Sequence, residues 1–268
     1  MICQYVNVGA REAIDALAHT SHFGDMSTLP GTTGRRRIYL MRHGHVDYFN
    51  PEVRERGTEH VPLTPLGREQ AQASGAALAH VRFDRALCSG LPRTRETAEI
   101  VLAANSDADH LTLDVDVALR EIKGGRMERA KSREELAARM AFEFDQAAKP
   151  GATMFGGEVF ADVQLRARRA IELLLAKPGW HTALVAAHEG INRLLLSWMT
   201  GNGLGGVQAF EQDLACVNIL DFDMVPKADG GVGTEIARAL IKAVNLTPYN
   251  YSKHGMNMTS LEAIFARV

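Results

Sequence analysis

Short apolar runs alternate with longer segments of helical periodicity along most of this chain. The apolar runs predict buried strands, and apolar residues that recur every three to four positions predict helices. The expected strands are 37–42, 86–88 and 182–187, and the expected helices are 65–80, 92–104, 132–148, 158–176 and 190–200. This alternation is typical of a mostly parallel sheet with helices on both faces, so we predict a three-layer α/β/α sandwich.

The two ends of the chain follow different patterns. Residues 1–34 mix a short helix-like run with a polar tract that contains glycine and proline, which predicts a mobile N-terminal extension or a lid. A single domain is expected over 35–268. Near its end, apolar segments at 217–223 and 235–244 flank a glycine-rich stretch, and this pattern predicts two strands joined by a long hairpin.

Composition is typical of globular proteins and narrows the range of partners. Of the 268 residues, 46% are hydrophobic and 23% are charged, so a sizeable core can form. The 30 Lys and Arg residues against 32 Asp and Glu residues give a net charge of −2, which provides no field for holding nucleic acid or an anionic membrane. We therefore expect neither partner, and we expect any anion site to be local.

Cysteine usage and the lack of a long apolar run indicate a cytoplasmic protein. Cys3, Cys88 and Cys216 are odd in number and far apart, so they predict neither a disulfide framework nor a cysteine zinc site. The sequence holds no apolar run of transmembrane length, and residues 1–34 lack the basic-then-apolar order of a secretory signal. The expected compartment is reducing.

Each of three predicted strands leads, at its C-terminal end, into a segment with basic side chains. These are Arg42 and His43 after the first strand, Arg93 after the second and His188 after the third. Ligands bind at this edge of parallel sheets, and Arg93 also falls in the first turn of a helix, where free N–H groups favour phosphate. A guanidinium can hold two phosphate oxygens at once. We predict that these four side chains converge around one tetrahedral anion.

Taken together, these segments resemble the histidine phosphatase superfamily, the phosphoglycerate-mutase-like proteins. Residues 42–44, Arg-His-Gly, resemble a signature of that family, and residues 89–98 resemble its Ser-x-x-x-Arg-x-x-x-Thr-Ala element. The segment 63–67 is similar to a helix-opening Leu-Thr-x-x-Gly. The likeness runs from about residue 37 to residue 244, and it implies a phosphoglycerate-mutase-like catalytic domain.

The resemblance also implies a phosphohistidine mechanism with a role for five side chains. His43 would attack phosphorus, while Arg42, Arg93 and His188 neutralise charge on the transferring oxygens. Glu121 alone would predict only a surface carboxylate, but it matches the acidic loop of the family. It would therefore protonate the leaving group and then activate water.

Glu189 is a rival to Glu121, because some branches of the family place the proton donor directly after the second histidine. The resemblance implies no cofactor and no metal, and the expected partner is a small phosphorylated substrate. Homo-oligomer formation is left open. We expect the segments 47–62 and 127–155 to form the outer wall of the pocket and to select the substrate.

Three alternatives follow from the same residues. A phosphoglycerate-mutase-type phosphotransferase shares the signature, but the Trp-rich substrate signature of that branch is absent around 123–129, which favours a phosphatase. Residues 43–47, His-Gly-His-Val-Asp, also match the start of a dinuclear zinc hydrolase site, although Tyr48 stands where that motif has histidine and Arg42 would repel a dication. A non-catalytic module that binds an anion would keep the same pocket.

Overall fold

The structure, a computed structural model, describes residues 34–48, 50, 57–108, 110–125, 135, 139 and 142–254. Apart from Gly34, the N-terminal extension predicted at 1–34 lies outside the described residues, and so do parts of the expected outer wall at 47–62 and 127–155. Within the described ranges, none of the helices combines the length and the apolar composition needed to cross a membrane.

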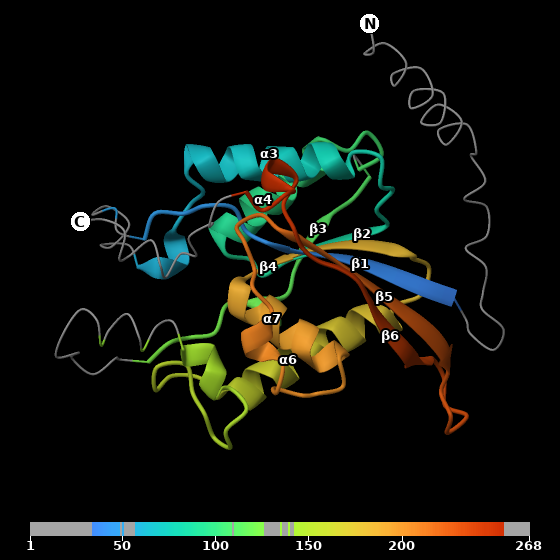
Figure 1. The fold of residues 1–268 in the computed structure, drawn as a ribbon. Helices are drawn as coiled ribbons and strands as arrows, with labels where there is room; N and C mark the ends of the chain where they lie inside the picture. The colour runs from blue at the N-terminus through green and yellow to red at the C-terminus, as the bar shows by residue number, and fades with distance from the viewer. Residues whose placement is uncertain are drawn as a thin grey trace, which may run out of the picture.

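Six strands form one mixed sheet in the order β3-β2-β4-β1-β5-β6 (Figure 1). The strands are β1 (Gly34–Arg42), β2 (Arg85–Cys88), β3 (Leu113–Val115), β4 (Thr182–Ala187), β5 (Val217–Pro226) and β6 (Thr234–Leu246). The first four pair in parallel, and β5 and β6 add the antiparallel part. The mostly parallel sheet is confirmed, and the antiparallel part is the predicted hairpin. The sequence does not predict β3, because its residues are half-buried or exposed and form no buried apolar run.

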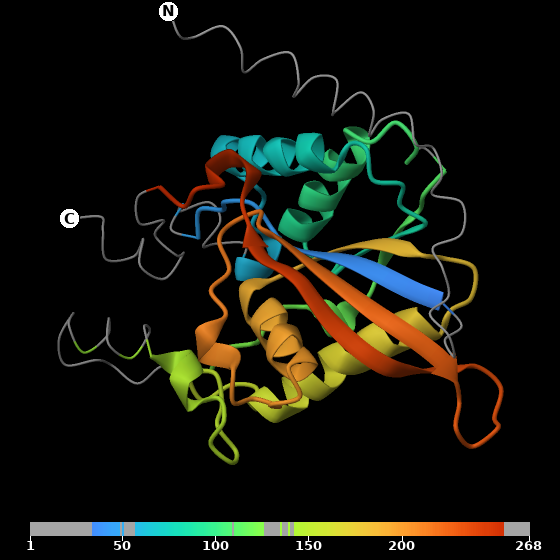
Figure 2. The same ribbon diagram turned by 45° about the vertical axis from the view of Figure 1, so that its right-hand side comes forward.

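Helices cover both faces of the sheet, with α3 and α4 on one side and α6 and α7 on the other (Figures 1 and 2). Their bounds are α3 Pro65–Leu78, α4 Pro92–Ala103, α6 Phe160–Ala176 and α7 Glu189–Met199. Short 3₁₀ helices connect them: η1 Thr58–His60, η2 Val117–Leu119, η3 Glu143–Gln146, η4 Val207–Ala209 and η5 Pro248–Asn250. One apolar cluster lies between the sheet and each helix layer, so the three-layer sandwich is confirmed.

One predicted helix differs from the structure. The prediction for 132–148 falls partly outside the described residues. Over 142–148 the chain forms turns and the 3₁₀ helix η3, so the predicted α-helix is wrong there. The Phe144 ring is buried beside the Phe160 ring, and the 3₁₀ helix places it there. Tertiary packing thus outweighs the local helical pattern at this position.

The first turn of α3 lies directly against the backbone that follows β1. A Cβ added to Gly67 would lie 2.2 Å from the His45 carbonyl oxygen, and one added to Gly44 would lie 2.3 Å from the Gly67 carbonyl oxygen. Thr64 caps the helix by accepting from the Gly67 amide at 3.2 Å, and its own amide donates to the His45 carbonyl at 3.0 Å. Two glycines therefore let α3 hold the loop that leaves β1.

We expect Gly67→Ala to lower the free energy of unfolding by about 1–3 kcal/mol, the usual cost of extra atoms in a packed site. In an ordinary helix interior the same change would stabilise by about 1 kcal/mol. Gly75→Ala, in the same helix, is the matched control, because an added Cβ there would lie no closer than 3.1 Å to its neighbours, the Ala104 Cβ and the Val101 Cα, and should cost much less. Urea unfolding measures the difference, and a Gly67→Ala protein as stable as the wild type would contradict this close crossing.

Candidate active site

Two histidines meet where β1 and β4 end. The strands are adjacent and parallel, with Arg42 paired to Ala187, and the His43 amide donates to the Ala187 carbonyl at 3.2 Å. His43 and His188 therefore leave the sheet together, and their ring centroids lie 5.3 Å apart. Both are buried, with exposed fractions of 3% and 0%. The structure thus brings together two side chains that are 145 positions apart in sequence (188 minus 43).

The local contacts of His43 fix which ring nitrogen carries the proton. Its Nδ1 lies 2.8 Å from the Gly44 carbonyl oxygen, which can only accept, so Nδ1 is the donor and Nε2 keeps a lone pair. Burial, followed by the charges of Arg93 and Arg42, holds the pKa of His43 well below its usual value. The imidazole is therefore neutral at neutral pH and carries a nucleophilic Nε2.

His188 is oriented by a chain of hydroxyl groups. The Thr94 hydroxyl donates to the Leu91 carbonyl at 2.9 Å, and the Ser89 hydroxyl lies 2.8 Å from the Thr94 oxygen and 2.8 Å from His188 Nε2. This order makes Ser89 the donor to Thr94 and the acceptor from His188 Nε2–H. The other nitrogen, Nδ1, is buried and has no hydrogen-bond partner within the described residues.

A buried nitrogen without a partner is costly, unless a ligand supplies the missing group. Burial and then the charges of Arg93, His43 and Arg42 hold the pKa of His188 well below its usual value. A dianion placed beside Nδ1 would reverse the balance of charge and favour the imidazolium. His188 can then donate to an oxygen of that anion.

Arg93 occupies the first turn of α4, directly after Pro92 at the start of the helix. Its side chain is almost fully buried, and its guanidinium carbon lies 5.8 Å from the centre of the Tyr48 ring. The Thr97 hydroxyl donates to the Arg93 carbonyl at 2.7 Å and accepts from the Gly44 amide at 3.1 Å. One threonine therefore joins the helix that carries Arg93 to the loop that carries His43.

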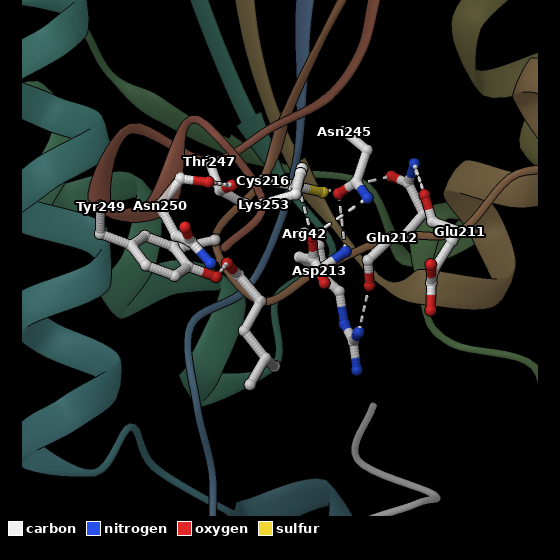
Figure 3. Close-up of polar contacts among 12 residues, drawn as sticks. Arg42, Glu211, Gln212, Asp213, Cys216, Asn245, Thr247, Tyr249, Asn250 and Lys253 are labelled. Atoms are coloured by element: carbon white, nitrogen blue, oxygen red, sulfur yellow. Dashed lines mark hydrogen bonds and ion pairs between the residues drawn. The ribbon is translucent and has the colours of Figure 1, made fainter. Parts of the chain in front are cut away.

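Arg42 is held by a carboxylate and by a backbone carbonyl. Its guanidinium lies 3.1 Å from the Glu189 carboxylate and donates to the Gln212 carbonyl, the contact drawn at the centre of Figure 3. Its amide donates to the Cys216 carbonyl at 3.2 Å. The Gln212 side chain is fixed in turn by hydrogen bonds with Asn218 at 2.7 and 3.0 Å. The loop 211–216 thus determines where the Arg42 guanidinium lies.

A C-terminal segment, residues 245–254, ties that loop down (Figure 3). Asp213 accepts from the Lys253 ammonium at 2.5 Å and from the Asn245 side-chain amide at 3.2 Å, while its own amide donates to Asn245 at 2.7 Å. The Tyr249 hydroxyl donates to the Leu214 carbonyl at 2.6 Å. These contacts join the C-terminal segment to the loop that positions Arg42.

Backbone strain lies within the same loop. Ala215 has a φ of 50°, in the left-handed region that costs a non-glycine residue about 1–2 kcal/mol. In this conformation its amide donates to the His43 carbonyl at 3.0 Å, and the Ser74 hydroxyl donates to its carbonyl at 2.8 Å. Surrounding contacts therefore hold a strained residue directly behind His43, as is common at functional sites.

The two candidate carboxylates have different surroundings. Glu121 accepts from the amides of Ile122 at 2.9 Å and Gly190 at 3.2 Å, at the N-terminus of α7. Loss of water around the carboxyl raises the pKa of Glu121 above its usual value, and the charge of Glu189 raises it further, while the two amides and the charge of Arg93 offset only part of the increase. Glu189 instead lies between two guanidiniums, with one oxygen 3.1 Å from Arg42 and the other 2.8 Å from Arg193.

The alternative zinc site lacks the necessary cluster. His45, the second histidine of that motif, has its Nδ1 2.8 Å from the Thr64 hydroxyl oxygen. In the part of the chain that the structure describes, no three His, Cys, Asp or Glu side chains come together as metal ligands would.

Sequence reasoning gave no role to Gln212 or Asp213, because neither lies in a periodic or signature segment.

Comparison with known proteins gives an independent view of this arrangement. Residues 38–225 match the family described as histidine phosphatase superfamily (branch 1). The chain is 30% identical over 192 residues to the adenosylcobalamin/alpha-ribazole phosphatase of Escherichia coli (strain K12), covering 70% of this chain and 90% of that protein. It resembles the crystal structure of a putative alpha-ribazole-5'-P phosphatase from Escherichia coli with a TM-score of 0.56 and 26% identity, over 78% of this chain and 96% of the other.

A third likeness concerns the fold alone. A mycobacterial glucosyl-3-phosphoglycerate phosphatase aligns with a TM-score of 0.60 at 23% identity, over 79% of this chain and 99% of that chain. The same sandwich is therefore found in proteins whose sequences have diverged widely. The family match covers the segments that supply both histidines and both arginines.

The buried neutral histidines predict a specific dependence of stability on pH. Because the pKa values of His43 and His188 are lowered in the folded protein, the unfolded chain binds more protons below about pH 6.5. The free energy of unfolding should therefore fall as pH decreases from 6.5, by up to about 1.4 kcal/mol per pH unit for each histidine. A His43→Asn/His188→Asn protein should show a shallower slope in urea unfolding at pH 7.0, 6.0 and 5.0. Exposed His110→Asn is the control, and identical slopes would contradict the prediction.

The contacts of the C-terminal segment predict that Asp213→Asn weakens anion binding without touching the anion. The change removes the charge that holds Lys253, so the loop 211–216 and Arg42 should lose their fixed position. We expect affinity for orthophosphate, measured by calorimetry, to fall about threefold to tenfold. Lys253→Met keeps the Asn245 contact and should have a smaller effect. Wild-type affinity in Asp213→Asn would show that Arg42 is held independently of this segment.

Proposed function

This chain belongs to the histidine phosphatase superfamily, and from that premise we propose that it hydrolyses a small phosphomonoester through a phosphohistidine on His43. One observation supports this most directly. A neutral imidazole with an available Nε2 lies beside a second imidazole whose buried Nδ1 needs a partner, and the charges of Arg42 and Arg93 act on both rings. A phosphoryl group satisfies all these groups at once.

The first half-reaction transfers the phosphoryl group to His43. Nε2 attacks phosphorus, an N–P bond forms, and the P–O bond to the leaving group breaks. Arg42, Arg93 and protonated His188 neutralise charge on the three non-bridging oxygens, where fixed donors in a water-poor site are most effective. The proton stays on Nδ1, which continues to donate to the Gly44 carbonyl, so His43 keeps its orientation throughout.

The proton for the leaving oxygen comes from Glu121. A carboxyl with a raised pKa is protonated for a larger fraction of the time near neutral pH, which suits a general acid. In the second half-reaction the same carboxylate takes a proton from water as the water attacks phosphorus and the N–P bond breaks. Glu189 suits this role less well, because one of its oxygens pairs with Arg42 and the other with Arg193.

Cys88 and Cys216 bear on the choice of nucleophile and on the cellular compartment. Burial raises the pKa of the Cys216 thiol to about 12, so the thiolate is unavailable despite its place next to Arg42. Cys88 and Cys216 are both free thiols, which supports a reducing, cytoplasmic compartment.

The substrate class follows from the relatives. The relatives compared above are named as an adenosylcobalamin/alpha-ribazole phosphatase and a putative alpha-ribazole-5'-P phosphatase, and alpha-ribazole-5'-P is a small phosphorylated molecule. We propose that the substrate of this chain belongs to the same class of small phosphorylated molecules, and we do not assign to it the particular substrate of either relative. A phosphatase is favoured over a phosphoglycerate-mutase-type transferase by the same comparison.

A phosphatase assay across a panel of small phosphomonoesters tests the proposal. We expect the wild type to hydrolyse members of the panel without added metal and in the presence of a chelator, and His43→Ala to lose at least about 10³-fold in kcat/KM. Acid quenching of the wild type during turnover of a ³²P-labelled substrate should destroy the labelled intermediate, whereas alkaline quenching should preserve it on His43.

Each remaining outcome separates an alternative. Loss of activity with chelator favours a metal hydrolase, and binding of orthophosphate without hydrolysis of any ester favours a non-catalytic module. His110→Ala is the matched control for histidine removal, because His110 is exposed and outside the site. Equal activity in wild type and His43→Ala would discard the proposal.

A further inference from the structure

The loop that carries Glu121 has no regular structure to hold it. Glu121 follows the 3₁₀ helix η2 and belongs to neither a strand nor an α-helix. Its carboxylate rests on the Gly190 amide, where a Cβ on residue 190 would lie 2.7 Å from the Glu121 oxygen. A placement this close requires that the loop itself be fixed from its other side.

Arg166 supplies contacts on that other side. It belongs to α6, whose apolar face is packed into the core, and its guanidinium donates to the carbonyls of Ala118 at 2.6 Å and Arg120 at 2.9 Å. A second nitrogen lies 3.5 Å from the Glu121 carbonyl and 3.0 Å from the Glu158 carboxylate. One planar side chain thus contacts three carbonyls of the loop.

Glu158 extends this support past Glu121. The same Glu158 oxygen that accepts from Arg166 also accepts from the Lys123 amide at 2.7 Å, and the Glu158 amide donates to the Lys123 carbonyl at 2.9 Å. A Cβ on Gly157 would lie 2.1 Å from that carbonyl, so the two backbones are in close contact. The loop is therefore held on both sides of Glu121, from 118 to 123.

We infer that Arg166 is a positioning residue for the proton donor: it fixes the backbone of 118–121 so that the Glu121 carboxyl faces the leaving oxygen. The inference rests on the proposed function and assigns a role to a side chain outside the family signatures. Arg166 acts through Glu121 and touches no reacting atom. A small displacement of a catalytic group can cost about 10²-fold in rate, so backbone contacts of this kind matter for the chemistry.

The test uses the dependence of the rate on the leaving group. 4-Nitrophenyl phosphate releases an acidic phenol that leaves with little help from a proton donor, whereas glycerol phosphate releases an alkoxide that needs one. We expect Arg166→Met to lower kcat/KM on glycerol phosphate at least about tenfold more than on 4-nitrophenyl phosphate. Arg166→Lys keeps the charge but loses the planar fork of donors, so it should recover part of that difference.

Two reference variants complete the design. Glu121→Gln removes the proton and should show the same selectivity in stronger form, about 10² between the two substrates. Arg168→Met is the matched control, because Arg168 lies in the same helix but pairs with the exposed Glu172 and stacks over Trp198. It should leave kcat/KM on both substrates within about twofold of wild type.

The outcomes distinguish this inference from the proposed function. Suppose that Glu121→Gln lowers kcat/KM more on glycerol phosphate than on 4-nitrophenyl phosphate, but that Arg166→Met and Arg166→Lys lower kcat/KM equally on both. Arg166 then only stabilises the fold, and the inference is overturned. If Glu121→Gln shows no selectivity, the assignment of the proton donor fails first. If urea unfolding shows that the Arg166→Met protein is not folded, the ratio of kcat/KM on the two substrates is compared between Arg166→Lys and wild type. Equal ratios in these two proteins would overturn the inference.

Discussion

The chemistry of this site depends on β1 and β4 running side by side in parallel. Their register pairs Arg42 with Ala187, so the next residue of each strand, a histidine in both cases, leaves the sheet at the same edge. Antiparallel pairing would place the two imidazoles at opposite edges, and a slip of one residue would turn each strand's side chains to the other face. Helices cover both faces of the sheet, so such a slip would move Leu40 and Val185 from the apolar cluster under α6 and α7 to the one under α3 and α4, and it would disrupt the packing of both.

Burial of the two histidines has an electrostatic consequence that the rest of the site exploits. Water that would stabilise an imidazolium is excluded, and the nearby guanidiniums add repulsion, so both rings are neutral before an anion binds. The hydrogen bonds then distinguish the two rings in the way that the proposed mechanism needs: the Gly44 carbonyl leaves the lone pair on Nε2 of His43, and the Ser89 hydroxyl leaves Nδ1 of His188 open to the proposed anion. One physical cause, desolvation, thus supports two different functions.

Sequence reasoning predicts the parts of this arrangement that local pattern encodes. Apolar runs mark β1 and β4, and the parallel class places His43 and His188 at one edge. The 3₁₀ turn around Phe144 is not predictable in this way, because it depends on a contact with Phe160 in a later helix. The same holds for Arg166, which on a helical pattern is merely one of several polar positions. The carbonyls of Ala118 and Arg120 that it contacts lie 48 and 46 positions away, and only the folded chain shows them.

The two halves of the site are held in different ways, and this has a consequence for how the substrate can vary. Strand ends, the first turn of α4 and the loop 211–216 hold the groups around phosphorus, and each is fixed by core packing or by buried hydrogen bonds. The Glu121 loop is held mainly by its backbone: two of its carbonyls accept from Arg166 and the Lys123 amide donates to Glu158, so these contacts do not depend on the side chains of the loop. Loop side chains such as Arg120 and Lys123 can therefore change without moving Glu121, the proposed proton donor, because their own amides and carbonyls carry the support. The fold thus separates a fixed phosphoryl site from a leaving-group side whose side chains are free to diverge.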